Sequence, residues 1–443
     1  MASAEHKRHL LVGLGRSGLA CLRFLLERGE RVDVTDAAAE LPALEEASLR
    51  DRDIGRCLGE LRAPRPIDEY ASLLLSPGIA PDSDIVRAAR DAGVEVINEI
   101  ELYARQVQVP VIAVTGSNGK STVVSMLGHV GEALGLRIGV GGNIGTPALE
   151  LLAGEFAAHV LELSSFQLEL VTGLRTRTAI VLNLSEDHLD RHASLAEYAR
   201  IKQRIYRECD RPLVNRGDSL AAGGIEAWAS IGEGEAGGDE SWGLIEREGS
   251  TWICRGDRGL LDAGRLRVAG RHNAFNAMAA LALLDAAGFD AEAAAEALTG
   301  FAGLPHRCQW VGRFDEVDWY DDSKGTNVGS TLAALNGLPA PIIWLGGGVG
   351  KGQDFSPIGP VLGARGKAAV TFGRDGGRIA EALQGHLPVH READLGSSVR
   401  RARALAAPGD TVLLSPACAS FDQFSGYEAR GRAFADAVKA VHA

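Results

Sequence analysis

The sequence predicts an α/β protein of three domains, each built on a mostly parallel sheet. Short runs of β-branched and aliphatic residues alternate with helical patterns along nearly the whole chain, and this alternation is typical of parallel sheets. Glycine-rich turns follow two of the early runs, at residues 13–18 and 116–119. The 443 residues are enough for about three domains of roughly 100–200 residues each.

Composition and charge exclude several classes of function. Hydrophobic residues make up 46% of the chain and charged residues 23%, which is ordinary for a globular protein. The net charge of −12 disfavours broad contact with nucleic acid, because a phosphate backbone attracts cations. The six cysteines are scattered without a CxxC pair, which indicates a reducing compartment and no zinc site. We find no signal peptide and no bilayer-spanning stretch, so we expect a cytoplasmic protein without membrane insertion.

The first domain opens with residues 9–15, a buried strand that runs into a glycine turn. A helix from Ser17 to Glu27 and a strand from Arg31 to Thr35 follow. The turn Gly13-Leu-Gly-Arg-Ser-Gly18, with Asp36 about 20 residues further on, matches the dinucleotide-binding fingerprint. The motif predicts a Rossmann-like domain with a phosphate-bearing ligand above the helix N-terminus. Taken literally it predicts NAD, and it leaves another nucleotide open.

A second polar turn lies in the same domain. The strand Ser72–Leu75 leads into Ser76-Pro-Gly78, and doubly wound sheets bind ligands at such carboxyl ends of strands. A helix after Pro81 and a strand at Val94–Ile97 complete the unit. We therefore assign residues 1–98 to this domain.

The second domain is organised around Gly116-Ser-Asn-Gly-Lys-Ser-Thr122, which follows a strand at 110–115 and opens a helix at 120–134. This order binds nucleotide phosphates, because the N–H groups of the loop and of the helix N-terminus face the anion. Lys120 adds a positive charge, and a loop hydroxyl can bind Mg²⁺. Val114 takes the place of the first glycine of the full P-loop pattern. We predict a central, P-loop-type mononucleotide-binding domain over residues 99–304.

Polar residues crowd the ends of three further strands, at 139–145, 161–165 and 183–190. Parallel strands end at one edge of a sheet, so these segments predict one cleft. Glu162 could reach Mg²⁺ on a bound triphosphate, or it could be a salt-bridged acid at a strand end. His188, which has carboxylates on both sides, could share a metal or lie in a charged surface loop.

Further candidates follow on two helices of this domain. By its own pattern, Lys202 beside Ile201 is a solvated helix lysine. His272, Asn273 and Asn276 share one face at the head of a strong helix, where they could bind a nucleotide or cap the helix. Between these helices the chain is Gly-rich and acidic, and we expect small strands there with a hairpin from Trp242 to Cys254.

In the third domain, over residues 305–443, strand and helix patterns alternate again and predict another Rossmann-like α/β unit. Arg307 could clamp a phosphate or pair with an acid. Asp322, Lys324 and Thr326 follow a strand in one tight polar run. The predicted strands lie near 317–320, 341–345, 368–372 and 411–415, and the predicted helices near 327–336, 375–384, 395–406 and 427–440.

Seven segments, taken in this order along the chain, resemble the Mur ligases of peptidoglycan synthesis. Within that family the resemblance is to the enzymes that join glutamate to UDP-N-acetylmuramoyl-L-alanine. The segments are Gly116–Thr122, Gly142–Gly145, Leu161–Glu169, Glu186–Asp190, Leu304–Arg307, Asp322–Lys324 and Ser415–Gln423. Several such matches in sequence are more specific than any one of them.

The resemblance implies a UDP-binding first domain, a central ATPase and a C-terminal domain that closes over the site. It implies an ATP-dependent ligase that forms an amide bond between UDP-N-acetylmuramoyl-L-alanine and glutamate, with D-glutamate favoured and L-glutamate as the alternative. The substrate carboxylate would attack the γ-phosphate of ATP to give an acyl phosphate and ADP. The glutamate amine would then displace phosphate. We expect a monomer.

The resemblance also assigns residues to each ligand. At positions that bind the UDP substrate lie Gly15, Arg16, Ser17, Asp36, Ser76, Pro77, Gly78, Asn143, Ser164 and His188. Around ATP lie Gly116, Ser117, Asn118, Gly119, Lys120, Ser121, Thr122, His272, Asn273, Asn276, Arg307 and Asp322. Around the incoming glutamate lie Lys324, Thr326, Lys351, Ser420, Phe421 and Tyr427.

The implied catalytic residues are Lys120, Glu162, His188 and Lys202. The resemblance implies two Mg²⁺ ions, with Ser121, Glu162, His188 and Lys202 as the residues that hold them. Lys202 matches the carbamylated lysine of the family, whose carbamate carries a negative charge. This replaces the prediction of a solvated lysine.

Three alternatives stay open. The nearest is a sister Mur ligase or a folylpolyglutamate synthase. An NAD-dependent oxidoreductase would use Gly13–Gly18 and Asp36, but it leaves Lys120 and Glu162 without a role. A nucleotide-gated binding protein would bind ATP without ligase chemistry, because a fold does not fix a function.

Overall fold

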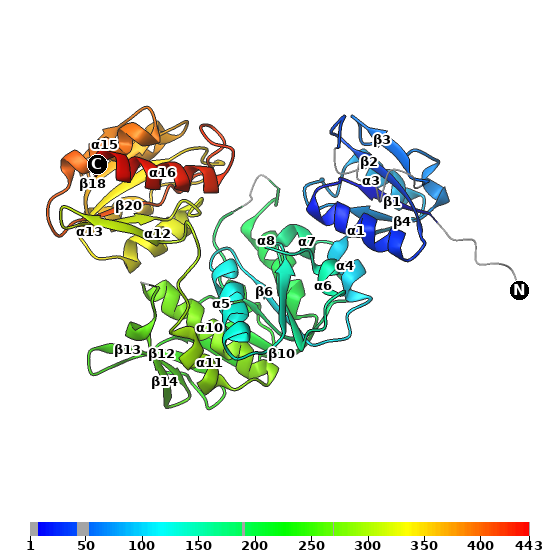
Figure 1. Ribbon diagram of the computed structural model, residues 1–443, viewed down its shortest axis with the longest axis horizontal. Helices are drawn as coiled ribbons and strands as arrows, with labels where there is room; N and C mark the ends of the chain where they lie inside the picture. The colour runs from blue at the N-terminus through cyan, green and yellow to red at the C-terminus, as the bar shows by residue number, and fades with distance from the viewer. Residues whose placement is uncertain (1–7, 42–52, 188–190, 269, 443) are drawn as a thin grey trace, which may run out of the picture.

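A computed structural model of the chain describes all residues except 1–7, 42–52, 188–190, 269 and 443. Three sheets follow one another along the chain, and each carries helices against it (Figure 1). The sheets have five, nine and six strands. The predicted α/β fold class is confirmed.

The first sheet has the strand order β3-β2-β1-β4-β5, and every pair in it is parallel. Its strands are β1 (Arg8–Val12), β2 (Arg31–Asp36), β3 (Gly55–Leu58), β4 (Tyr70–Leu75) and β5 (Glu95–Ile97), and its helices are α1 (Arg16–Glu27), the 3₁₀ helix η2 (Ile67–Glu69), α3 (Asp84–Asp91) and α4 (Glu99–Ala104). The order reverses between β1 and β4, so both glycine turns of this unit lie at a topological switch point, where such sheets bind ligands.

The second sheet has the order β14-β13-β12-β11-β10-β9-β6-β8-β7. Its strands are β6 (Val111–Thr115), β7 (Ile138–Gly142), β8 (Ala158–Glu162), β9 (Arg175–Val181), β10 (Glu208–Asn215), β11 (Ala229–Glu233), β12 (Trp242–Arg247), β13 (Ser250–Arg255) and β14 (Arg258–Asp262). Only β12-β13 and β13-β14 are antiparallel. The predicted hairpin is confirmed as β12 and β13, and the structure shows that it extends the central sheet.

The helices of the second unit are α5 (Lys120–Ala133), α6 (Ala148–Leu151), α7 (Ser165–Leu168), α8 (Leu195–Lys202), η3 (Gln203–Tyr206), α9 (Ser219–Ala222), η4 (Ala263–Arg265), α10 (Arg271–Ala287) and α11 (Ala291–Leu298). Strand β6 is buried on both faces, as expected for a central parallel strand. Its Ile112 and Val114 pack with α5 and α10, while Val111 and Ala113 face a second apolar cluster. That second cluster includes Leu22 of α1, so the first and second units share buried apolar surface.

The third sheet has the order β15-β16-β20-β17-β18-β19, parallel except for β15. Its strands are β15 (Gln309–Phe314), β16 (Val317–Asp321), β17 (Ile342–Gly347), β18 (Gly366–Phe372), β19 (Val389–Arg391) and β20 (Thr411–Leu414), and its helices are α12 (Val328–Gly337), α13 (Ile358–Arg365), α14 (Gly376–Ala382), α15 (Leu395–Leu405) and α16 (Tyr427–His442). The predicted strands and helices of this unit are present. The structure adds β15, β19 and α13, which are short or lie partly at the surface and lack a clear periodic pattern.

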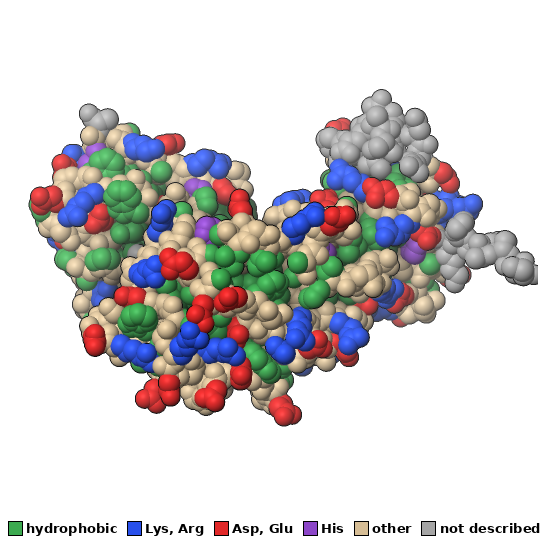
Figure 2. Space-filling model, turned by 60° about the horizontal axis from the view of Figure 1, so that its bottom comes forward, with side chains coloured by type: hydrophobic (Ala, Val, Ile, Leu, Met, Phe, Trp, Pro, Cys, Tyr) green, Lys and Arg blue, Asp and Glu red, His purple; other side chains and the backbone are tan. Residues whose placement is uncertain are grey.

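The surface carries charged side chains of both signs (Figure 2). On the face drawn in Figure 2, acidic and basic side chains are interspersed, and a hollow lies between the third unit on the left and the first unit on the right. All six cysteines are free thiols. Among the described helices, none combines the length and the apolar character needed to cross a membrane.

Candidate active site

The phosphate loop joins β6 to α5 and is shaped by two glycines. Gly116 and Gly119 have φ of +146° and +85°, which residues with a side chain rarely adopt. A Cβ at Gly119 would also lie 2.5 Å from Oδ1 of Asn276. Lys120 folds back over the loop, and its Nζ donates to the carbonyl oxygens of Gly116 and Ser117 at 2.7 and 2.8 Å. Burial lowers the pKa of Lys120, while Glu162 and Asp187 oppose this shift.

Glu162 ends β8, the strand next to β6, and lies opposite Val114 in the register. Its Oε1 accepts a 2.8 Å hydrogen bond from Nδ2 of Asn143, which follows β7. Its Oε2 is buried and has no hydrogen-bond partner in the described part of the chain. A buried carboxylate oxygen without a partner is costly unless a ligand binds it. The site therefore fits a cation held on a phosphate.

No group of three His, Cys, Asp or Glu side chains that could hold a metal occurs among the described residues. Mg²⁺ commonly takes one or two protein oxygens and completes its shell with phosphate and water. Glu162 and the hydroxyl of Ser121 fit that pattern. His188, the third predicted ligand, lies outside the described residues.

The loop after β9 is tied to the phosphate loop by several hydrogen bonds. Ser117 donates its backbone N–H to the carbonyl of Asn183 at 2.8 Å, and the backbone N–H of Asn118 donates to Oδ1 of Asn183 at 2.9 Å. The backbone N–H of Ser185 donates to Oγ of Ser117 at 3.0 Å. The two loops therefore form one platform at the strand ends, as the sequence predicts.

Lys202 is buried at the end of α8, with 1% of its surface exposed. Its Nζ donates to Oγ1 of Thr115 at 3.1 Å and lies 4.7 Å from the centre of the Tyr198 ring. Burial holds the pKa of Lys202 well below its ordinary value, and the charge of Lys120 lowers it further. The prediction of a solvated lysine, made from the local pattern, is wrong. Helical periodicity does not reveal which partner covers a helix face.

A cavity of about 360 Å³ lies between the second and third units. It brings together nine of the predicted ligand residues, and these are Asn118, Gly119, Thr122, His272, Asn273, Asn276, Arg307, Asp322 and Lys324. Burial lowers the pKa of His272 to about 4, so this ring is neutral at pH 7. Nδ1 of His272 has no partner among the described residues.

Arg307 reaches from the third unit into this cavity. Its Nη2 donates to Oγ of Ser121 at 2.8 Å. Its neighbours His306 and Cys308 have φ of +62° and +45°, so Arg307 is presented by a strained turn. Strain of this kind persists only where surrounding contacts hold it, and it is common at functional sites.

Asp322 is buried under the same cavity. Oγ of Ser415 donates to its Oδ2 at 2.6 Å, and the backbone N–H of Cys308 donates to its Oδ1 at 3.2 Å. Burial raises the pKa of Asp322 to about 7 despite these bonds. Cys308 and Ser415 were not among the predicted site residues. Ser415 begins one of the segments that carry the family resemblance, and Cys308 directly follows another.

The residues predicted around glutamate lie on the third unit. Nζ of Lys324 is 3.9 Å from the centre of the Tyr427 ring, and burial lowers the pKa of Lys324 to about 8. Nζ of Lys351 lies 3.9 Å from Oδ1 of Asp187 in the second unit. An isolated bridge between Val349 and Ala419 brings the turn of Lys351 beside the segment that holds Ser420.

Two further residues predicted around glutamate are Phe421 and Thr326. Phe421 is 74% exposed. Thr326 lies beside Lys324, to whose carbonyl it donates its backbone N–H at 2.8 Å.

The residues predicted for UDP border the first and second units. Asp36, at the end of β2, accepts hydrogen bonds from the backbone N–H groups of Leu14 and Ala38 at 2.6 and 2.8 Å. Arg16 reaches across to the carbonyl of Gly145, in the turn that follows Asn143.

Three other residues predicted for UDP have structural partners. Oγ of Ser76 donates to the carbonyl of Gly13 at 2.6 Å. Ser164 caps α7, and Gln167 closes the capping box. Gly15 is the N-cap residue of α1.

Three family descriptions match successive parts of the chain. The Mur ligase MurD-like N-terminal domain matches residues 7–98, the Mur ligase middle domain matches 114–284, and the Mur ligase glutamate ligase domain matches 306–418. Among solved structures, a pseudomurein peptide ligase type C from Methanothermus fervidus has 17% identity and a TM-score of 0.63, covering 98% of this chain and 100% of that one. The UDP-N-acetylmuramate-alanine ligase MurC from Thermotoga maritima has 20% identity and a TM-score of 0.61, covering 98% and 99%.

Curated relatives extend the similarity over the full length. The UDP-N-acetylmuramoylalanine–D-glutamate ligase of Nitrosococcus oceani is 44% identical over 437 residues, covering 98% of this chain and 96% of the relative. The enzyme of the same name from Pseudomonas aeruginosa is 43% identical over 447 residues, covering 99% of both chains. The chain therefore belongs to the Mur ligase family.

Proposed function

We propose that the protein joins D-glutamate to UDP-N-acetylmuramoyl-L-alanine with ATP, and that ADP and phosphate are the other products. The observation that carries the proposal is the cavity between the second and third units, where Arg307 faces the phosphate loop that holds Lys120. Glu162, whose Oε2 has no partner among the described residues, ends the strand beside that loop. The full-length similarity to ligases named for this reaction supports the choice of substrates.

The first step is attack of the alanine carboxylate on the γ-phosphorus of ATP. An O–P bond forms, the bond between the γ-phosphorus and the bridging oxygen breaks, and ADP leaves with that bond pair. Lys120 and Arg307 place positive charge where the equatorial oxygens gain negative charge. Glu162 and Ser121 would hold Mg²⁺, which would supply further positive charge against the phosphates. We propose His188 and Lys202 as residues that hold a second ion.

The second step is attack of the glutamate amine on the acyl phosphate. The C–N bond forms, the C–O bond to phosphate breaks, and phosphate leaves through a tetrahedral intermediate with the oxygen and the bond pair. The nitrogen gives up one proton, which ends on the released phosphate. Lys324, Lys351, Thr326, Ser420, Phe421 and Tyr427 would bind the incoming glutamate. Lys324 lines the cavity and Lys351 lies beside Asp187 of the second unit, so these two side chains offer cations for the two carboxylates of glutamate. Closure around them excludes water, which would otherwise hydrolyse the intermediate.

We also propose that Lys202 is carbamylated. The neutral amine adds to CO₂, a C–N bond forms, and one proton is released to leave an anionic carbamate. The low pKa of the buried Lys202 supports this step, because only the unprotonated amine is a nucleophile. A carbamate would place a negative charge beside Lys120.

The UDP part of the substrate would lie between the first and second units, over Gly15, Arg16 and Ser17 and beside Asp36, the Ser76–Gly78 turn, Asn143 and Ser164. The proposed boundaries of the three domains are residues 98 and 304. A cytoplasmic monomer completes the proposal. An oxidoreductase is disfavoured, because it gives the phosphate loop and the third unit no role.

The decisive experiment measures phosphate release with ATP, Mg²⁺ and UDP-N-acetylmuramoyl-L-alanine. D-glutamate, L-glutamate, meso-diaminopimelate and lysine are compared as acceptors. We expect release that depends on D-glutamate, with one phosphate per amide formed. Equal release without any amino acid would contradict the ligase, and a preference for another acceptor would point to a sister enzyme.

A further inference from the structure

Asn327 is the residue before α12, and its side chain serves two groups of neighbours. Its Oδ1 accepts a 2.8 Å hydrogen bond from the backbone N–H of Ser330, and Ser330 Oγ completes a capping box. Since the backbone N–H is a donor, the oxygen of the carboxamide must face Ser330. The amide nitrogen of Asn327 therefore points away from its own helix.

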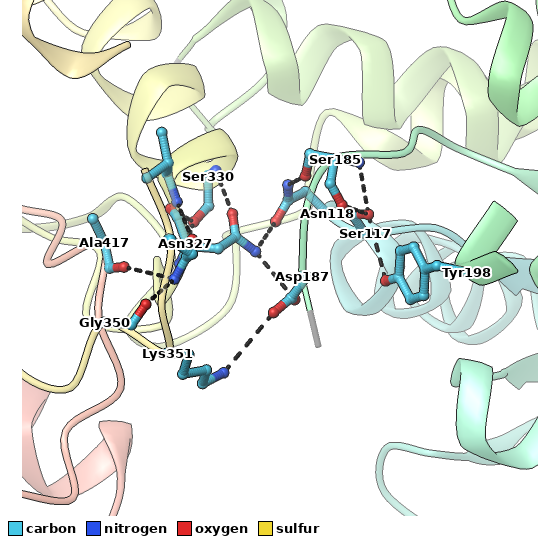
Figure 3. Close-up of polar contacts among 12 residues, drawn as sticks. Ser117, Asn118, Ser185, Asp187, Tyr198, Asn327, Ser330, Gly350, Lys351 and Ala417 are labelled. Atoms are coloured by element: carbon cyan, nitrogen blue, oxygen red, sulfur yellow. Dashed lines mark hydrogen bonds and ion pairs between the residues drawn. The ribbon is translucent and has the colours of Figure 1, made fainter. Parts of the chain in front are cut away.

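That amide nitrogen crosses to the second unit. Nδ2 of Asn327 donates to Oδ1 of Asn118 at 3.2 Å and to Oδ2 of Asp187 at 3.3 Å (Figure 3). Only 4% of Asn327 is exposed. Nδ2 of Asn118 faces Oγ of Ser185 at 3.4 Å, which leaves its Oδ1 free to accept from Asn327.

The two acceptors belong to the platform formed by the phosphate loop and the loop after β9. Asn118 lies in the phosphate loop itself, and Asp187 precedes the predicted metal ligand His188. Ser117 and Ser185 bind each other across the two loops (Figure 3). The side-chain amide of Asn327 therefore contacts both loops at once, and it can make both hydrogen bonds only when the two loops are correctly placed.

On its own side, Asn327 is joined to the segment predicted to bind glutamate. The backbone N–H of Val328 donates to Oε1 of Gln353 at 3.0 Å, and Nε2 of Gln353 donates to the carbonyls of Gly350 and Ala417 at 3.1 and 3.4 Å. Lys351, in the same turn, faces Asp187 (Figure 3). A shift of α12 would therefore move Lys351 as well.

The approach at this contact is close. A Cβ at Gly329 would lie 2.9 Å from Oγ of Ser185 and 3.2 Å from Nδ2 of Asn118. Gly329 has an ordinary helical φ, so its lack of a side chain is not required by its backbone conformation. The small residue instead lets the first turn of α12 rest on the platform.

We propose that Asn327 is a positioning residue that sets the third unit against the phosphate loop and Asp187, and so brings the glutamate site to the γ-phosphate of ATP. This inference rests on the proposed function for the identity of the two ligands. The hydrogen bond to the Asp187 carboxylate is charge-assisted and directional, which suits a contact that must fix orientation. The capping hydrogen bond from Ser330 fixes the orientation of the carboxamide, so its amide nitrogen already points toward the second unit.

The variant that isolates the contact is Asn327→Asp. A carboxylate caps α12 as well as the carboxamide does, so the helix is preserved. The variant loses the donor to Asn118 and places a negative charge against Asp187. We expect kcat/KM for glutamate to fall about 10-fold or more. KM for UDP-N-acetylmuramoyl-L-alanine should stay unchanged, because the first unit is not touched.

The matched control is Asp394→Asn. Asp394 caps α15 through the same kind of box, with Ser397 in the place of Ser330, and its helix packs against α16, β17 and β18 of the third unit. We expect this control to leave both kinetic constants unchanged. Equal losses in Asn327→Asp and Asp394→Asn would mean that only cap stability matters, and would overturn the proposal.

Two further variants test the geometry. The first is a double-mutant cycle with Asp187→Asn. The double variant Asn327→Asp/Asp187→Asn again pairs one amide with one carboxylate. Its kcat/KM, relative to the wild type, should therefore exceed the product of the relative kcat/KM values of the two single variants. Losses that simply multiply would overturn the proposal. Gly329→Ala should lower kcat/KM for glutamate without lowering the melting temperature.

A readout independent of the reaction separates this proposal from the proposed function. Fluorescent labels on the second and third units report their distance with an unreactive ATP analogue and Mg²⁺. We expect a longer mean distance in Asn327→Asp than in the wild type or in Asp394→Asn. If the wild type releases no phosphate with any acceptor, the proposed function fails, and this distance still decides the role of Asn327.

Discussion

The guanidinium of Arg307 donates a 2.8 Å hydrogen bond to the hydroxyl of Ser121, although 186 positions separate the two residues. The bond brings a cation of the third unit to the hydroxyl that we propose as a ligand of Mg²⁺. Bound Mg²⁺ and ATP would draw both groups to the phosphates. The relationship therefore links nucleotide binding to the position of the third unit.

Arg307 gives the first prediction. Arg307→Ala should lower kcat by about 100-fold, because a charged donor to the transferring phosphoryl group is lost. Arg307→Lys keeps the charge without the planar fork and should retain part of the activity. Steady-state phosphate release measures both variants. Equal kcat in Arg307→Ala and the wild type would remove Arg307 from the reaction.

Lys202 gives the second prediction. Lys202→Ala should lose most of its activity and regain part of it when a short carboxylate is added, since the carboxylate replaces the carbamate. Acetate and formate are suitable additives, and chloride at equal ionic strength is the control. Full activity of Lys202→Ala without any addition would contradict the proposed carbamate.

Lys324 gives a prediction on pH. Its pKa of about 8 means that the free enzyme loses this cation as the pH rises through 8. Because kcat/KM reports groups of the free enzyme, kcat/KM for glutamate should fall above pH 8. Lys324→Arg keeps its charge at this pH, so the fall of kcat/KM attributed to Lys324 should disappear. The ionisation of the glutamate amine is the same for both enzymes and cannot account for a difference between them. An unchanged profile in Lys324→Arg would exclude Lys324 as the group.

His272 gives a prediction on stability. Its pKa in the folded protein is lowered to about 4, so folding favours the neutral ring. The stability from this group is complete above pH 6.5 and is lost as the pH falls toward 4, by up to about 3 kcal/mol. Urea unfolding at several pH values measures it. The free energy of unfolding of His272→Gln should depend less on pH over this interval. An equal loss of stability toward acid pH in both proteins would contradict the assignment to His272.

The order of elements could be predicted from the sequence with few errors. Alternating periodicities identified β6, α5 and β9, and the turns Gly13–Gly18 and Gly116–Gly119 are the places where we expect ligands to bind. These features are local, because a glycine turn and a helix start depend on a few neighbouring residues. The resemblance to the family added substrates that no local pattern specifies.

Distant contacts could not be predicted in the same way. Lys202 looked solvated from its helix, and only its packing beside Thr115 and Tyr198 shows that it is buried. The partners of the Asn327 Nδ2 lie more than 100 positions away, so no spacing rule connects them to α12. A side chain that faces another unit shows no periodic sign of its partner.

The sequence by itself determined three α/β units, the phosphate loop around Lys120 and the family to which the chain is similar. The tertiary structure alone decided that Glu162 keeps one buried oxygen free, that Arg307 meets Ser121, and that Asn327 joins the third unit to the second. The reason is physical. Local propensity forms each element, whereas hydrogen-bond partners and burial depend on how elements from distant parts of the chain pack together.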